Sequence, residues 1–86
     1  MNQFTPEPSQ ELLLIRPKNV SEGMGAVLAV RSHKTVVLDL SVIDNGQAQR
    51  IADFVSGGVS AVDGKEHRLG DQVFLFAPAG VQVTLN

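Results

Sequence analysis

The sequence of 86 residues contains no cysteine, tryptophan or tyrosine, and only 19% of its residues are charged. The absence of cysteine excludes disulfide bonds, zinc sites with thiolate ligands and thiol catalysis. The 7 Lys and Arg residues are scattered and are outnumbered by 9 Asp and Glu, so we expect no nucleic-acid binding driven by phosphate neutralisation. No uninterrupted apolar stretch exceeds 6 residues, whereas roughly 20 are needed to span a bilayer.

Residues 1–11 contain two of the four prolines, no Lys or Arg and no apolar run, so they predict a flexible leader and do not resemble a signal peptide. We therefore predict a cytoplasmic protein, with an ordered core domain over residues 12–86. The chain is 43% hydrophobic, enough for one small core. A domain of this size buries only about 60% of its unfolded surface, which favours a dimer or a larger assembly.

The first half of the chain alternates strand and helix patterns. The apolar runs at 12–16 and 35–40 predict buried strands. Residues 21–32 predict a helix that Ser21 caps. A second helix begins at Asp44, which forms a capping box with Gln47 three residues later, and the pair Gly57-Gly58 is predicted to end it.

The second half changes to a period of two. Residues 59–62 and 65–69 predict a hairpin around Asp63-Gly64, and residues 72–77 predict a further strand. The alternating segment 81–85 adds a possible last strand. We therefore predict an α/β (α+β) sandwich in which two helices pack on one face of a mixed sheet of about five strands, in the order β-α-β-α-β-β-β.

Two helices cover one sheet face only, and strand 72–77 is apolar on both faces. If Val73 and Leu75 face the helices, Phe74 and Phe76 face the other way and need another cover. The pattern thus predicts a homodimer formed through the sheet, with Phe76 as a candidate self-assembly residue.

Residues of the types that carry chemistry are few. His33 and His67 are far apart in sequence, and neither has a carboxylate at a ligand-like spacing, so we expect no metal site. Asp39 has two readings, a catalytic acid or the cap of a neighbouring turn. Ser32, His33 and Asp39 have the types of a nucleophile triad, but no strained elbow presents the serine. Gly23-Met24-Gly25 lacks the third glycine of a dinucleotide loop. The sequence predicts no enzyme and no cofactor.

The segment VVLDLSVID, residues 36–44, resembles the strand and turn of STAS domains, which are regulatory switches. That family places a phosphorylated Ser or Thr directly after the aspartate, whereas Asn45 and Gly46 follow Asp44 here. A STAS-like switch domain is the alternative interpretation.

A resemblance to the SepF family of bacterial cell-division proteins covers most of residues 12–83. The segments that carry it are LLLIRPKN, KTVVLDLSVID, AQRIADFVSGGVSAVDG and RLGDQVFLFAP, followed by GVQV. The elements DFxSG, residues 53–57, and VFLFAP are the specific ones.

The resemblance implies a non-catalytic adaptor that forms dimers and polymers, binds the C-terminal tail of the tubulin-like protein FtsZ and tethers its filaments at the septum. It implies Phe74 and Arg68 as tail-binding residues, although ordinary core and surface roles stay open for them. It also implies Gly57 as a polymer contact, beside the simpler reading of a helix stop. The family's amphipathic membrane helix has no counterpart in residues 1–11. Membrane attachment is therefore expected only of a longer parent protein.

Overall fold

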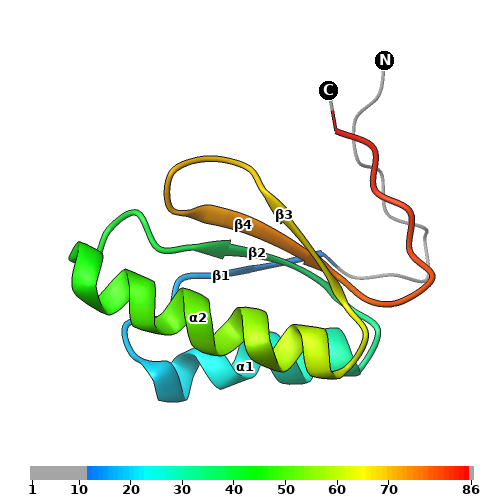
Figure 1. Ribbon diagram of the computed structural model, residues 1–86, viewed down its shortest axis with the longest axis horizontal. Coiled ribbons are helices and arrows are strands. Elements are labelled where there is room, and N and C mark those ends of the chain that lie inside the picture. Colours follow the sequence, from blue (N-terminus) through cyan, green and yellow to red (C-terminus); the bar gives the residue numbers. More distant parts are fainter. Residues whose placement is uncertain (1–11, 86) are drawn as a thin grey trace.

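The computed structural model describes residues 12–85, so the predicted leader lies outside the described residues. Two helices and four strands follow one another as β1 (Leu12–Ile15), α1 (Val20–Arg31), β2 (Thr35–Asp39), α2 (Asn45–Ala61), β3 (Lys65–Arg68) and β4 (Val73–Ala77). The strands form one sheet in the order β1-β2-β4-β3, and both helices lie on the same side of it (Figure 1). This arrangement confirms the predicted fold class.

The sheet is mixed. β1 pairs with β2 in parallel, whereas β4 is antiparallel to both of its neighbours, β2 and β3. The structure has four strands, so the expectation of about five is wrong. Residues 81–85 form no strand: the Val81 N–H donates to the Pro78 carbonyl oxygen at 3.2 Å. Alternating residues form a strand only when a neighbouring backbone supplies hydrogen-bond partners.

Both helices begin at side-chain caps. Asn19, one residue before α1, accepts a hydrogen bond from the Glu22 N–H at 2.8 Å, so Ser21 is not the cap. Asp44 caps α2 as predicted and accepts from the Gln47 N–H at 3.0 Å. The Gln47 side chain does not complete a capping box, because its Nε2 donates to the Lys18 carbonyl oxygen instead.

The second helix does not end where the sequence predicts. α2 continues through Gly57 and Gly58 to Ala61, so residues 59–62 are no hairpin strand. Gly58 lies against α1, where an added Cβ would stand 2.7 Å from Cγ2 of Val27, and this close approach requires glycine inside the helix. Asp63, with a φ of 63°, makes the left-handed turn from α2 into β3.

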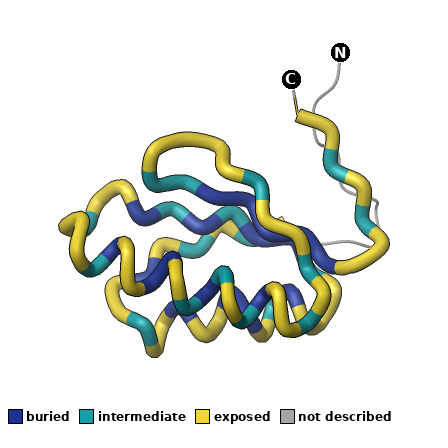
Figure 2. Tube along the Cα trace, in the orientation of Figure 1, coloured by how far each residue is buried: buried dark blue, intermediate teal, exposed yellow. Residues whose placement is uncertain are grey.

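The hydrophobic core lies between the helices and the sheet (Figure 2). Strand pairing sets Val36 opposite Phe76 and Leu38 opposite Phe74, and all four side chains belong to the core cluster with α1 and α2. Phe74 is 5% exposed and Phe76 is fully buried. The expectation that these rings face away from the helices is therefore wrong, and Phe76 does not lie on the uncovered side of the sheet.

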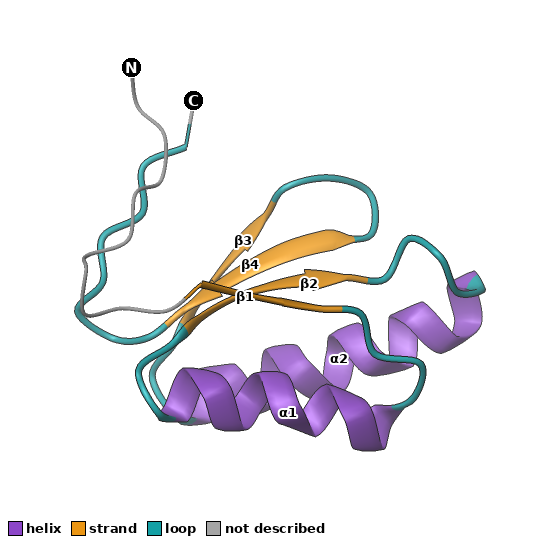
Figure 3. Cartoon of the chain, turned by 180° about the vertical axis from the view of Figure 1, so that it is seen from behind, coloured by secondary structure: helices purple, strands orange, loops and turns teal. Residues whose placement is uncertain are grey.

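The second face of the sheet, away from the helices, carries Leu12 and Leu14 of β1, Val37 of β2, and Val73 and Leu75 of β4. Strand pairing sets these side chains on one face, and within residues 12–85 no helix covers it (Figure 3). Leu12 and Leu14 are 46% and 58% exposed. The prediction of a sheet face without helices is thus confirmed, with the opposite set of β4 side chains on it.

Candidate functional site

Arg68 and Phe74, which the sequence predicts to act together, lie directly opposite each other on β3 and β4. The Arg68 Cζ stands 5.3 Å from the centroid of the Phe74 ring, a cation–π distance. The Phe74 ring stacks on Phe76 with 6.1 Å between centroids and 24° between planes. Phe74 therefore belongs mainly to the core, and the guanidinium of Arg68 covers its ring.

The Arg68 guanidinium is also bound to the loop between β3 and β4. Its Nε donates to the Gly70 carbonyl oxygen at 3.0 Å, and its Nη2 donates to the Asp71 carbonyl oxygen. The Leu69 and Gly70 N–H groups both donate to the Val73 carbonyl oxygen, at 2.9 and 3.2 Å. The Arg68 side chain thus adds to the backbone hydrogen bonds that hold the β3–β4 loop.

Gln72 joins this hairpin to the rest of the domain. Its carbonyl oxygen accepts from the Leu40 N–H at 2.8 Å, directly after β2, and its Nε2 donates to Oδ1 of Asn45 at 3.3 Å, at the start of α2. We call Arg68, Gly70, Asp71, Gln72 and Phe74 the hairpin corner. It is a polar surface over a buried ring.

Strand β3 is also bound to α2 by a hydrogen bond between side chains. The Ser56 hydroxyl donates to Oε1 of Glu66 at 2.6 Å. Strand β3 is therefore bound to α2 at Glu66 and to the β3–β4 loop at Arg68.

Gly57, the expected polymer contact, lies on the outer surface of α2. An added Cβ there would meet nothing within 4 Å, in contrast to Gly58. It lies inside the helix and not at its end, so a helix stop does not explain it. Gly57 lies in the helix layer, on the other side of the sheet from the second face (Figure 1).

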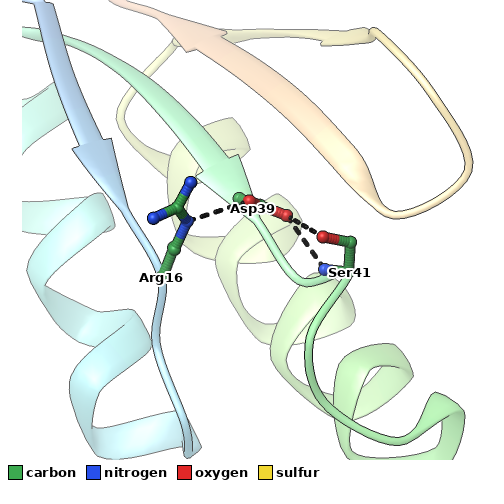
Figure 4. A network of polar contacts seen from close by, with 3 residues as sticks. All are labelled: Arg16, Asp39 and Ser41. Carbon is green, nitrogen blue, oxygen red and sulfur yellow. Dashed lines mark hydrogen bonds and ion pairs between the residues drawn. The ribbon is translucent and has the colours of Figure 1, made fainter.

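Asp39 lies at the carboxyl end of β2, where it binds two partners (Figure 4). Its Oδ1 accepts from the Ser41 hydroxyl at 2.6 Å and from the Ser41 N–H at 2.9 Å, and its Oδ2 pairs with Nε of Arg16 at 3.0 Å. Hydrogen bonds from Ser41, and then from Arg16, lower the pKa of Asp39 to about 2. Asp39 therefore caps a turn and is ionised at neutral pH. Of the two interpretations, catalytic acid and turn cap, the structure supports the turn cap.

The candidate catalytic residues do not come together. Ser32 and His33 lie in the turn before β2, whereas Asp39 lies at the opposite end of that strand. His67 lies on β3. Within residues 12–85 no three His, Asp or Glu side chains form a group that could hold a metal ion. None of the described helices has the length and apolarity to cross a bilayer.

Sequence reasoning missed three residues. Gly58 was predicted to end the helix. It follows Ile51 by seven positions, which places it on the apolar side of α2. Gln72 acts largely through its backbone, which no sequence pattern reveals. Ser41 could have been found, because an aspartate side chain often accepts the backbone N–H two residues further on, in an Asx turn.

The fold and the surface define a small two-layer α/β domain with apolar side chains exposed outside its core. A family model described as "Cell division protein SepF" matches residues 13–83. The domain is thus one of the class found in cell-division proteins. The chain belongs to the SepF family.

The relatives agree with this assignment. The chain is 47% identical over 76 residues to the cell division protein SepF of Prochlorococcus marinus strain MIT 9515, covering 88% of the chain and 40% of that protein. It is 46% identical over 74 residues to SepF of Trichormus variabilis, covering 86% of the chain and 37% of that protein. The chain therefore spans about two fifths of the length of these relatives.

Solved structures share the fold. A SepF-like protein from Archaeoglobus fulgidus is similar with a TM-score of 0.75 and 18% identity, over 88% of this chain and 94% of that one. SepF from Methanobrevibacter smithii, solved in complex with FtsZ-CTD, is similar with a TM-score of 0.69 and 21% identity, over 88% and 99% of the two chains.

Proposed function

We propose that this chain is the core of a non-catalytic cell-division adaptor that binds the C-terminal tail of FtsZ. The observation that carries the proposal is membership of the SepF family over residues 13–83, together with the shared fold of a SepF protein solved in complex with FtsZ-CTD. The STAS-like alternative concerns only residues 36–44, all of them inside the region that the SepF model matches.

The hairpin corner is the proposed binding site for the FtsZ tail. It contains both residues that the family resemblance implies, Phe74 and Arg68, and they are in contact. Because Phe74 is only 5% exposed, its ring would support the binding surface from the core and would make little direct contact with the tail. The Arg68 guanidinium uses two of its five N–H donors within the hairpin corner, which leaves the others for oxygen atoms of a bound peptide.

The second face of the sheet is the proposed dimer interface. Leu12 and Leu14 are each about half exposed, and burying them against the same residues of another copy removes apolar surface from water. Phe76 would contribute by supporting the sheet, since it is buried on the helix side.

The outer surface of the helix layer is the proposed contact for larger assemblies. Met24 and Leu28 of α1 are 41% and 42% exposed, and Gly57 on α2 leaves open space beside it. Two interfaces on opposite layers of one domain link dimers into an open polymer. The protein would act on the cytoplasmic side of the division septum, without a cofactor. Membrane attachment would need an amphipathic helix of the kind the family carries before this core.

The test is co-sedimentation of the chain with assembled FtsZ. We expect the chain to pellet with filaments of intact FtsZ and to stay in the supernatant with filaments of FtsZ that lacks its C-terminal tail. Equal pelleting with both kinds of filament would contradict tail binding, and no pelleting with either would contradict the adaptor function.

A further inference from the structure

His67 lies on the second face of the sheet, next to apolar side chains. Strand pairing sets it opposite Leu75 of β4, and residues opposite each other in an antiparallel pair place their side chains on the same face. His67 is half-buried and makes no hydrogen bond or ion pair within residues 12–85. No carboxylate among these residues therefore offsets the cost of burying a positively charged imidazole.

The charged groups on the second face do not compensate for a charge on His67. Lys65, two residues earlier on β3, shares its face and is itself positive. The next strand, β4, carries only apolar side chains there. Beyond it, Asp39 of β2 lies opposite Val73 and is paired with Arg16 at 3.0 Å. Because the pKa of Asp39 is about 2, this carboxylate does not titrate between pH 6 and pH 8.

The remaining charged groups of the hairpin lie elsewhere. Glu66 and Arg68 pair with Phe76 and Phe74, whose side chains belong to the core under the helices. Glu66 therefore faces α2, where it accepts from the Ser56 hydroxyl. Asp71 is exposed in the loop after β3. His67 is thus the histidine that a second copy would cover if it packed on the second face.

We propose that His67 makes the dimer acid-sensitive, so that two copies associate through the second face while His67 is neutral and separate when it is protonated. This inference rests on the dimer interface proposed above. Histidine changes its charge between about pH 5 and pH 8, so the switch would respond to acidification of an otherwise neutral solution.

The two simplest ways of stacking the sheets give the same sign. When the strands of both copies are aligned, a two-fold axis along the strands places β3 over β1 of the other copy, and an axis across the strands places β3 over β3. In the first case a protonated His67 would be desolvated by leucines. In the second case two positive imidazoles would face each other. Both arrangements favour the neutral form.

The overall charge of the protein predicts the opposite trend. The net charge is −2 with both histidines neutral, and protonation of the histidines brings it towards zero. Repulsion between copies would then fall, and association would strengthen as the pH is lowered. A dimer that weakens in acid therefore indicates a local cost at the interface and not an effect of net charge.

The experiment measures the dissociation constant of the dimer by sedimentation velocity at pH 8 and pH 6, with circular dichroism to show that each protein is folded. The variants are His67→Gln, which stays neutral, and His67→Lys, which stays charged. The matched control is His33→Asn. His33 is exposed in the turn before β2 with a φ of 67°, a conformation that asparagine also adopts. Leu14→Glu tests whether the dimer uses the second face.

We expect the wild type and His33→Asn to dissociate more readily at pH 6, with a dissociation constant raised by about fivefold or more. His67→Gln should keep the same dissociation constant at both pH values, and His67→Lys should form weak dimers at both. Acid sensitivity that persists in His67→Gln, or wild-type dimers that strengthen at pH 6, would overturn the switch. If His67→Gln fails to fold, His67→Lys decides, because wild-type association of this variant at pH 8 would also overturn it.

Failure of the interface itself gives a different result. A wild type that is monomeric at pH 8, or a Leu14→Glu variant that remains dimeric, would overturn the proposed interface and the switch together. Neither result depends on the pH, so the two failures are distinguishable.

Discussion

Replacing Phe74 by alanine should strongly destabilise the domain. A loss of FtsZ binding in this variant would therefore not show that Phe74 contacts the tail. The ring is 5% exposed, stacks on Phe76 and lies under the Arg68 guanidinium. Truncating a buried phenylalanine costs about 3–5 kcal/mol through lost burial and the cavity that remains. A chain of 86 residues has a free energy of unfolding of only about 4–13 kcal/mol. Phe74→Ala should therefore lose at least about a quarter of the stability of the domain.

The assay is urea unfolding followed by circular dichroism, with Leu28→Ala as the control. Leu28 is 42% exposed on α1, so its truncation should cost less than about 1 kcal/mol. Phe74→Leu fills most of the cavity and is the variant to use for binding. A loss of less than about 1 kcal/mol in Phe74→Ala would refute the reasoning, because it would show that the ring does not belong to the core. It would also restore Phe74 as a direct contact of the tail.

Five further predictions concern other parts of the domain. Gly58→Ala should destabilise the fold by about 1–3 kcal/mol, because its Cβ would meet Val27 at 2.7 Å. Gly57→Ala, which meets nothing within 4 Å, should stabilise α2 by up to about 1 kcal/mol; urea unfolding measures both. Gly57→Lys should leave dimers intact and block larger assemblies, and Leu14→Glu should give monomers, both measured by light scattering. Asp39→Asn should lower stability at neutral pH and remove part of the acid sensitivity of the fold, measured by thermal unfolding between pH 2 and pH 7.

The sign of the last prediction follows from the pKa of Asp39. Its folded-state pKa of about 2 lies below the ordinary aspartate value of 3.8, so the ionised carboxylate stabilises the fold above pH 3.8. That contribution is lost as the pH falls toward 2. An acid unfolding profile of Asp39→Asn identical to that of the wild type would contradict it. Equal stability of Gly57→Ala and Gly58→Ala, polymers of unchanged size in Gly57→Lys, and dimers in Leu14→Glu would contradict the others.

Much of the fold follows from local patterns in the sequence. The cap at Asp44 and the apolar positions Ile51 and Val55 specify α2, and the β-branched run at 35–39 specifies the central strand β2. These signals act between near neighbours in the chain, so a single sequence contains them in full.

The errors come from contacts between distant residues. Gly58 reads as a stop because its need for glycine arises from Val27, some thirty positions earlier. The direction of Phe74 and Phe76 is invisible because every residue of β4 is apolar, so alternation cannot tell one face from the other. At the site, the family resemblance brought Arg68 and Phe74 together. The Arg68 guanidinium donates to backbone carbonyl oxygens. Their positions depend on the path of the loop, which cannot be predicted from the residue types alone.

The most direct measurement of the central claim is a calorimetric titration of this chain with a synthetic FtsZ C-terminal peptide, with light scattering to give the mass of the protein in solution. A peptide of the same composition in scrambled order is the control. The account predicts saturable binding of one peptide per protomer to a dimer, and no binding of the scrambled peptide. A folded protein that binds neither peptide, or binds both equally, would contradict it.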